Sequence, residues 1–232
     1  MLYKGFSEPM KTKILILSTL LLVCLTQPVH AEHQMDEIPM YDGQHNPQIT
    51  ENKEFSENAA QLGWKYYYSG DYPTAIKRFN QAWMFNRNNP EAFWGFGLIM
   101  GARSKEENPK KNLNESIKFL EKADTLSKNN PRIMIDLAYS ETVLGYFLKG
   151  TQKKGFQSHF DKAEILFKES KKLEKTYPLL YSNWSVLYFY EEKYIEAKEK
   201  LDIAKNLGFK PNPDYEKDLT TKLNISKNKI QK

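Results

Sequence analysis

Residues 62–82 read LGWKYYYSGDYPTAIKRFNQA, and this stretch decides the fold. It contains two segments whose apolar residues recur at helical spacing, on either side of a short polar turn. Gly70 lies in this turn and can take the left-handed backbone conformation that a tight connection needs. Gly63, in the first segment, allows the second segment to approach closely, because a larger side chain would hold two packed helices apart. The stretch therefore predicts a helical hairpin.

The hairpin pattern occurs four times along the chain. Each second helix carries a bulky residue and then small residues seven positions apart, as in Tyr72-x2-Ala75-x3-Phe79-x2-Ala82, Leu113-x2-Ser116-x3-Leu120-x2-Ala123, Phe160-x2-Ala163-x3-Phe167-x2-Ser170 and Tyr194-x2-Ala197-x3-Leu201-x2-Ala204. Each first helix carries a bulky residue directly followed by a small one, at Leu62-Gly63, Phe96-Gly97, Leu137-Ala138 and Trp184-Ser185. One hairpin cannot bury its apolar face alone, so the repeat predicts hairpins that stack into an all-α solenoid.

Prolines indicate where the units begin. Pro90, Pro131 and Pro178 each open a first helix, because the first helical position tolerates the missing N–H of proline. The predicted units cover about 56–89, 90–130, 131–177 and 178–211. The two inner units are longer than the outer two, so we expect them to carry extra residues between their helices.

The segments that flank the repeats differ from them. Residues 32–55 are polar and interrupted by proline and glycine, which is typical of an exposed leader or linker. Within residues 212–232, the spacing of Tyr215, Leu219 and Leu223 predicts an amphipathic capping helix that seals the last unit and ends in a basic tail.

The repeated units resemble the tetratricopeptide repeat (TPR) family. The first unit matches the family consensus at Leu62-Gly63, Tyr66, Gly70-Asp71-Tyr72, Ala75, Phe79 and Ala82, and the last unit matches it nearly as well. The inner units depart from it, with Glu141 in place of a bulky residue. The resemblance implies a right-handed superhelical solenoid of about four TPR hairpins plus a C-terminal capping helix, with a concave groove along the first helices.

By the same resemblance, the residues that face the groove are mostly aromatic: Trp64, Tyr67, Tyr68, Trp94, Leu98, Tyr139, Phe189 and Tyr190. Aromatic rings bury a large area and can hydrogen-bond, which suits an extended peptide or a helix of a partner protein. The alternative is that some of these rings pack between neighbouring repeats. Family members that bind acidic chaperone tails use Lys, Asn and Arg on this face; the matching places here offer only Asn183, so we exclude that ligand class.

Cations gather where the first helix turns into the second in the two longer units, at Arg103, Lys105, Lys110, Lys111, Lys149, Lys153 and Lys154. They predict a basic rim on one edge of the solenoid, which would contact an anionic lipid, a glycan or an acidic partner. The alternative is an ordinary solvated face.

Residues 1–31 are predicted to be a secretory signal peptide. Lys11 and Lys13 precede an apolar run from Ile14 to Leu25, and small residues end the segment at Ala31. We therefore expect a periplasmic protein, with secretion as the alternative. The only cysteine, Cys24, lies in a sequence similar to the lipobox of bacterial lipoproteins, so membrane contact is expected only if Cys24 is lipidated.

Composition and motifs favour binding over catalysis. A net charge of +5 is mild, which argues against nucleic acid as a partner. The sequence lacks a His-Glu-x2-His metal motif, a glycine-rich phosphate loop and a nucleophile elbow, so we expect no catalytic residues, no metal and no cofactor. His159 is expected to have a capping or surface role. The nearest metal candidate is the leader set, where closing a site costs chain entropy: His33, Asp36, Glu37, Asp42 and His45.

The predicted function is that of an exported, non-enzymatic adaptor or scaffold. It would bind a partner protein or peptide of the cell envelope in the aromatic groove. The alternative is a carrier of a small ligand, lipid or glycan on the same groove, with the basic rim at its charged end.

Overall fold

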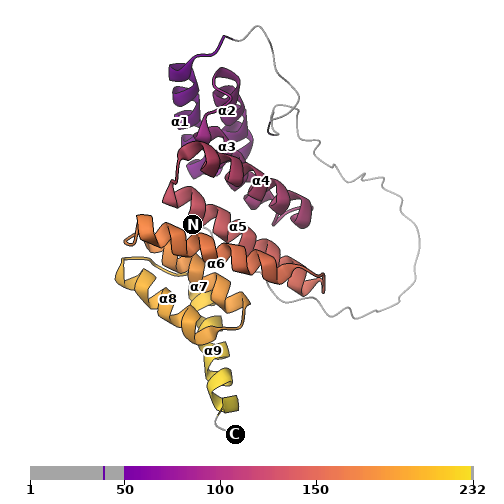
Figure 1. Cartoon of the computed structure of the whole chain (residues 1–232), viewed down its shortest axis with the longest axis vertical. Coiled ribbons are helices and arrows are strands. Elements are labelled where there is room, and N and C mark those ends of the chain that lie inside the picture. Colours follow the sequence, from indigo (N-terminus) through magenta and orange to yellow (C-terminus); the bar gives the residue numbers. More distant parts are fainter. Residues whose placement is uncertain (1–38, 40–49, 231–232) are drawn as a thin grey trace, which may run out of the picture.

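The protein folds into a stack of helices (Figure 1). The structure is a computed structural model that describes Pro39 and residues 50–230, so the predicted signal peptide, Cys24 and most of the polar leader lie outside it. The regular elements of the described part are all α-helices, none of which is long and apolar enough to cross a membrane. They are α1 (Lys53–Ser69), α2 (Tyr72–Phe85), α3 (Pro90–Arg103), α4 (Pro109–Ser127), α5 (Pro131–Gly150), α6 (Phe156–Leu173), α7 (Pro178–Tyr190), α8 (Tyr194–Asn206) and α9 (Pro213–Ile230).

The helices pair in chain order as hairpins. α1 packs on α2, α3 on α4, α5 on α6 and α7 on α8, and each hairpin packs on the next. Figure 1 shows the hairpins following one another along the long axis, from the indigo α1 to the yellow α9. The prediction of an all-α solenoid of helical hairpins is therefore confirmed.

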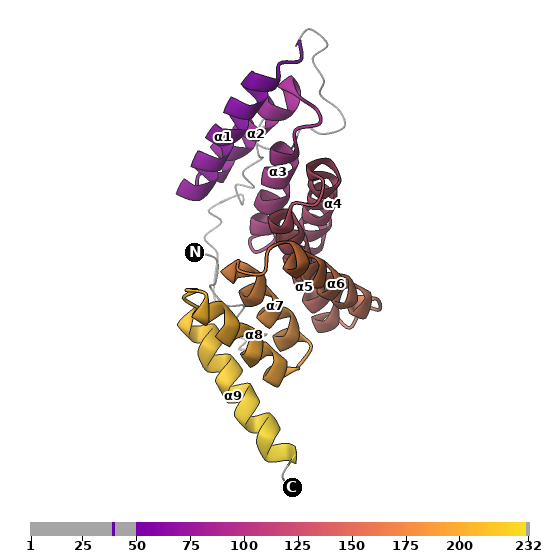
Figure 2. The same cartoon turned by 60° about the vertical axis from the view of Figure 1, so that its left-hand side comes forward.

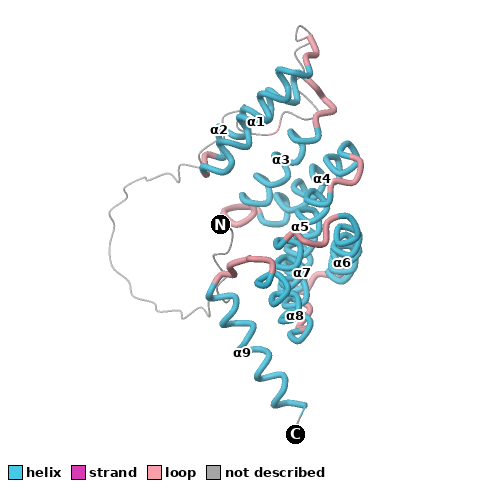
Figure 3. The backbone as a smooth tube through the Cα atoms, turned by 90° about the vertical axis from the view of Figure 1, so that its left-hand side faces the viewer, coloured by secondary structure: helices cyan, strands magenta, loops and turns pink. Residues whose placement is uncertain are grey.

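The first helices of the hairpins form the inner layer of the stack. α1 contacts α3, α3 contacts α5 and α5 contacts α7, whereas α2, α4 and α6 each contact the first helix of the next hairpin. In Figure 3, α4 and α6 lie on the side away from the opening between α1 and α9, and Figure 2 shows the same opening from another direction. Helices on the inside of a curved stack lie closest together, so α1, α3, α5 and α7 line its concave side.

Proline and asparagine begin the first helices. Pro90, Pro131 and Pro178 are the first residues of α3, α5 and α7, as predicted. The side chain of Asn89 caps α3 by accepting a hydrogen bond from the backbone N–H of Glu91 at 2.9 Å. Asn130 caps α5 in the same way.

Glycine brings the first two hairpins together around one ring. The side chain of Phe79 is fully buried between Gly63 of α1 and Gly95 of α3. A Cβ atom added at Gly63 would lie 2.6 Å from this ring, and one at Gly95 would lie 2.3 Å from it. Gly70 ends α1 with a φ of 83°, the left-handed conformation that its place in the turn predicts.

The extra residues of the inner units mostly lengthen helices. α4, α5 and α6 contain 19, 20 and 18 residues, against 13 in each of α7 and α8. The connections 104–108 and 151–155 are only slightly longer than 70–71 and 191–193. The expectation of extra residues between the helices is thus only partly right, because apolar residues of the added turns, such as Leu148, are buried as helix.

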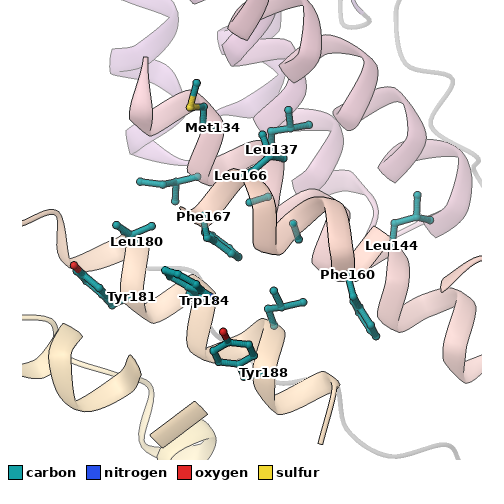
Figure 4. Packing of buried hydrophobic residues seen from close by; sticks show 14 of the residues in the cluster. Met134, Leu137, Leu144, Phe160, Leu166, Phe167, Leu180, Tyr181, Trp184 and Tyr188 are labelled. Atoms are coloured by element: carbon teal, nitrogen blue, oxygen red, sulfur yellow. The ribbon is translucent and has the colours of Figure 1, made fainter. Parts of the chain in front are cut away.

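The apolar core runs through the whole stack as two clusters. The first lies in α1 to α4 and the start of α5, around Phe79, Phe93 and Phe96. The second lies in α4 to α9, where the rings of Phe167 and Trp184 stack with centroids 5.8 Å apart (Figure 4). Because successive hairpins share these clusters, each first helix is held firmly between its neighbours.

The last helix covers the end of the stack with only part of its length. α9 packs on α8, and its Leu219 is fully buried in the second core cluster. Further along α9, Ile225 is 49% exposed, and the helix points away from the other helices (Figures 1 and 2).

Candidate functional site

Half of the predicted groove residues gather in one place, here called the aromatic cluster: Trp64, Tyr67 and Tyr68 of α1 and Trp94 of α3. Trp64 is central, with its ring centroid 4.9 Å from Trp94, 5.7 Å from Tyr67 and 5.9 Å from Tyr68. Tyr68 stacks on Trp64 and is 80% exposed, whereas the other three rings are half-buried. The aromatic cluster is therefore a packed set of rings in which one ring, that of Tyr68, is largely exposed.

Two carboxyl groups belong to this cluster. The indole Nε1 of Trp64 donates a hydrogen bond to Oε2 of Glu91 at 2.6 Å, and the indole Nε1 of Trp94 donates one to Oδ2 of Asp136 at 2.7 Å. Glu91 comes from the first turn of α3 and Asp136 from α5, so the site spans three successive hairpins. Each bond fixes the orientation of one indole ring.

Both carboxyl groups are partly withdrawn from water. Burial raises the pKa of Asp136 from its ordinary 3.8 to about 7, although the hydrogen bond from Trp94 acts in the opposite direction. Burial likewise raises the pKa of Glu91, against the hydrogen bond from Trp64. Burial and the nearby Asp136 raise the pKa of Tyr67. Within residues 50–230, neither Asp136 nor Glu91 forms an ion pair.

Arg132, which is on the same helix as Asp136, contacts other groups. Tyr177, just before α7, has a raised pKa through burial and the charge of Asp136, while Arg132 lowers it. The guanidinium of Arg132 lies 4.8 Å from the ring centre of Tyr177, and its Nε is 3.5 Å from Oε2 of Glu174. Arg132 therefore stacks on one ring and pairs with another acid at the margin of the site.

Sequence reasoning missed Glu91 and Asp136. Asp136 directly precedes the pair Leu137-Ala138, just as Asn183 precedes Trp184-Ser185. Because Asn183 was singled out at that register, comparing the same position in every unit is the signal that would have found Asp136. The partner of its carboxyl, Trp94, lies 42 residues away in the sequence.

The predicted groove residues of the last unit are occupied by contacts within the chain. Tyr190 stacks on Tyr146 with ring centroids 3.9 Å apart, and Phe189 lies edge-on to Tyr194 and Tyr215 at 5.7 and 5.5 Å. Tyr215 belongs to α9, and its hydroxyl lies 2.6 Å from Oγ of Ser185. The capping helix therefore covers this end of the concave side, and the alternative of packing between elements applies to Phe189 and Tyr190.

The two remaining predicted groove residues are half-buried. Leu98 lies four residues after Trp94, about one helical turn along α3 and so on the same face of that helix. Tyr139 lies on α5 near Tyr190 and Tyr215, whose pKa values are raised mainly by burial and to a lesser degree by Tyr139. Leu98 thus shares a helix face with Trp94, and Tyr139 lies near the rings at the end of the stack that α9 covers.

The predicted basic rim is split by the structure. Arg103 ends α3 with only 6% of its surface exposed, so the interior holds it away from the rim. Nζ of Lys149 donates to the backbone oxygen of Tyr190 at 3.0 Å and to Oε1 of Glu192 at 2.6 Å, which ties α5 to the next hairpin. The other five cations are exposed: Lys105, Lys110, Lys111, Lys153 and Lys154.

An ionic network around the buried Glu141 joins α4, α5 and α6. Glu141 of α5 is 1% exposed, and its carboxylate oxygens lie 2.6 Å from Nδ1 of His159 and 2.7 Å from Nζ of Lys162. Lys162 also pairs with Glu121 of α4 at 2.6 Å. His159 thus has a structural partner rather than only the surface or capping role expected for it. Glu141, the departure from the repeat consensus, is what ties α4, α5 and α6 together.

The described residues contain no group of three or more His, Cys, Asp or Glu side chains that could hold a metal ion. The leader set of two histidines and three acids lies outside them. What the concave side offers is a surface of aromatic rings and hydrogen-bond acceptors.

Comparison with solved structures agrees with this architecture. The chain is similar to TTC0263, a thermophilic TPR protein of Thermus thermophilus, with a TM-score of 0.55 and 17% identity over 66% of this chain and 74% of that one. It also matches a structure of PilF of Pseudomonas aeruginosa, with a TM-score of 0.33 and 15% identity over 68% of this chain and 78% of that one. No protein-family model and no curated protein matches the sequence. The likeness to TTC0263 shows that the fold is a TPR-type stack of hairpins.

Proposed function

We propose, from a fold shared with a TPR protein, that this chain is an exported adaptor that binds a partner protein or peptide of the cell envelope on the concave side of its stack. The observation that carries the proposal is the aromatic cluster, in which Tyr68 stays 80% exposed while three half-buried rings support it. An exposed ring held by a rigid base is the usual anchor of a protein interface, because little side-chain entropy is lost on binding.

Export and the envelope as the place of action rest on residues 1–31, whose layout is that of a secretory signal peptide. An aromatic concave surface on an exported chain favours a partner that is itself exported or displayed on a membrane. The alternative of a small-ligand carrier with a basic rim has weaker support, because Arg103 is buried and Lys149 is bonded to the next hairpin.

Affinity capture from the envelope fraction tests the adaptor function. The full chain is the bait, beside a Tyr68→Ala bait and a Phe55→Ala bait. Phe55 is a matched control because it is an aromatic residue of the same helix, 58% exposed and three to four turns away from Tyr68. We expect one or more proteins to be captured by the native and Phe55→Ala baits and lost with Tyr68→Ala. Equal capture by all three baits would contradict a partner in the groove.

A further inference from the structure

Two carboxyl groups border the aromatic cluster, and no cation of the described part of the chain pairs with them. Glu91 and Asp136 each accept one hydrogen bond from an indole N–H. Arg132, on the same helix as Asp136, is held by Glu174 and by the ring of Tyr177. Two acids therefore stand in a setting that disfavours their ionised form.

The rings around these acids add to the same preference. A cation over an aromatic face is attracted by the negative face of the ring, and tryptophan is the best ring for this contact. Trp64 and Trp94 lie with ring centroids 4.9 Å apart and planes inclined at 71°. Phe79 and Tyr68 also pack on Trp64, so Trp64 supports the exposed ring of Tyr68. Tyr68 lies over Trp64 at an interplanar angle of 27° and leaves its outer face open. The cluster thus offers aromatic faces and carboxylate oxygens together.

The chemistry of the cluster separates classes of partner. An acidic segment would meet like charge at Glu91 and Asp136. A wholly apolar segment would cover the two carboxyl groups without pairing them, at the cost of an unpaired buried charge. An arginine or lysine side chain satisfies both parts of the site, and a guanidinium fits best because its plane stacks on rings while its edge donates to a carboxylate.

We propose that the aromatic cluster with Glu91 and Asp136 binds an arginine or lysine side chain presented by the partner segment. This rests on the proposed adaptor function, of which it names the ligand chemistry. The cation enters past the exposed ring of Tyr68 and supplies the positive charge that the two carboxylates lack. This is the reverse of a groove that selects an acidic tail.

Tryptophan fluorescence of the full chain provides the test. The probe is a hexapeptide that alternates arginine and alanine, beside the same peptide with citrulline in place of arginine, which keeps the shape and removes the charge. The chain has a net charge of +5, so it does not attract a cationic peptide by overall charge, and binding reports a local site. We expect the arginine peptide to bind at least about tenfold more tightly than the citrulline peptide.

Two variants locate the site. Asp136→Asn keeps an oxygen that accepts the hydrogen bond of Trp94 but removes the charge, and it is expected to weaken the arginine peptide about tenfold and the citrulline peptide little. Asp218→Asn makes the same change of charge at an exposed residue of α9 and is expected to leave both affinities unchanged. If Asp136→Asn does not fold, Glu91→Gln makes the same test, since its amide oxygen still accepts from Trp64.

The proposal is overturned if the arginine and citrulline peptides bind alike, if neither binds, or if Asp136→Asn and Asp218→Asn behave alike. The adaptor function fails separately. If the captured partner is lost with Tyr68→Ala but retained in full by Asp136→Asn, the adaptor stands and the cationic ligand is wrong. If capture is insensitive to Tyr68→Ala, the groove itself is wrong.

Discussion

Asp136 is a titratable residue of the proposed site whose pKa is raised by burial. Its folded-state pKa of about 7 lies above its ordinary 3.8, so between these values the folded protein holds a proton that the unfolded chain has lost. This group therefore stabilises the fold at the acidic end of that interval, and its contribution is lost as the pH rises towards 7. Above 7 the ionised, buried carboxylate is a standing cost.

Asp136→Asn removes this titration while the hydrogen bond from Trp94 is kept. We expect the variant to gain free energy of unfolding relative to the native protein as the pH rises from about 4 to about 7, and to hold that gain above 7. Urea unfolding of both proteins across this interval measures the difference. Parallel pH profiles of the two proteins would show that Asp136 is not shifted as described.

Gly95 is the residue on which the contact between the first two hairpins depends. A Cβ atom there would lie 2.3 Å from the ring of Phe79, which is fully buried. We expect Gly95→Ala to lower the free energy of unfolding by roughly 1–3 kcal/mol through overpacking, measured by urea unfolding. Gly150→Ala is the control, because no atom lies within 4 Å of its added Cβ atom. An equal loss of unfolding free energy in both variants would mean that the contact with Phe79 is not the cause of the loss.

At the scale of the element, α9 shows how a repeat stack is closed. It contributes the fully buried Leu219 to the core and lays Tyr215 over Phe189, where the first helix of a further hairpin would otherwise pack. Its distal half, in which Ile225 is 49% exposed, makes little contact with the stack. The first turns of α9 therefore cover the core, and its distal half contributes little to the packing.

Truncating one apolar side chain in each half of α9 tests this division. Leu219→Ala is expected to cost roughly 2–5 kcal/mol of unfolding free energy, because it leaves a cavity in a fully buried place. Ile225→Ala, on the same helix, is expected to change it by about 0.5 kcal/mol or less. Urea unfolding followed by circular dichroism measures both. Similar costs for the two variants would mean that α9 is packed along its whole length.

At the scale of the whole molecule, the repeat register could be predicted because it depends on local chemistry. Pro90, Pro131 and Pro178 are favoured at the first position of a helix by their own geometry, and Gly70 turns the chain by its own conformational freedom. The meeting of Trp64 and Trp94 followed from that register, since both lie on the same face of successive first helices. Helix order was thus accessible from the sequence, and half of the predicted groove residues lie together in the structure.

The rest depended on how the hairpins are stacked. The bond from Trp94 to Asp136 joins two hairpins whose relative angle no local pattern specifies. The contact between the rings of Phe189 and Tyr215 depends on where α9 packs against the stack. Arg103 was assigned to a loop, but α3 continues through it and carries its side chain into the interior. These errors concern tertiary placement rather than the identity of the repeats.

The proposed site draws its groups from α1, α3 and α5, which are the first helices of three successive hairpins. A ligand that contacts three successive hairpins holds the spacing between them. The protein with this ligand bound is then stiffer along its long axis than the free protein. Pulling the two ends of the stack apart separates these three hairpins and weakens their contacts with the ligand. If the proposed site is occupied as we infer, tension along the stack therefore favours release of the bound segment.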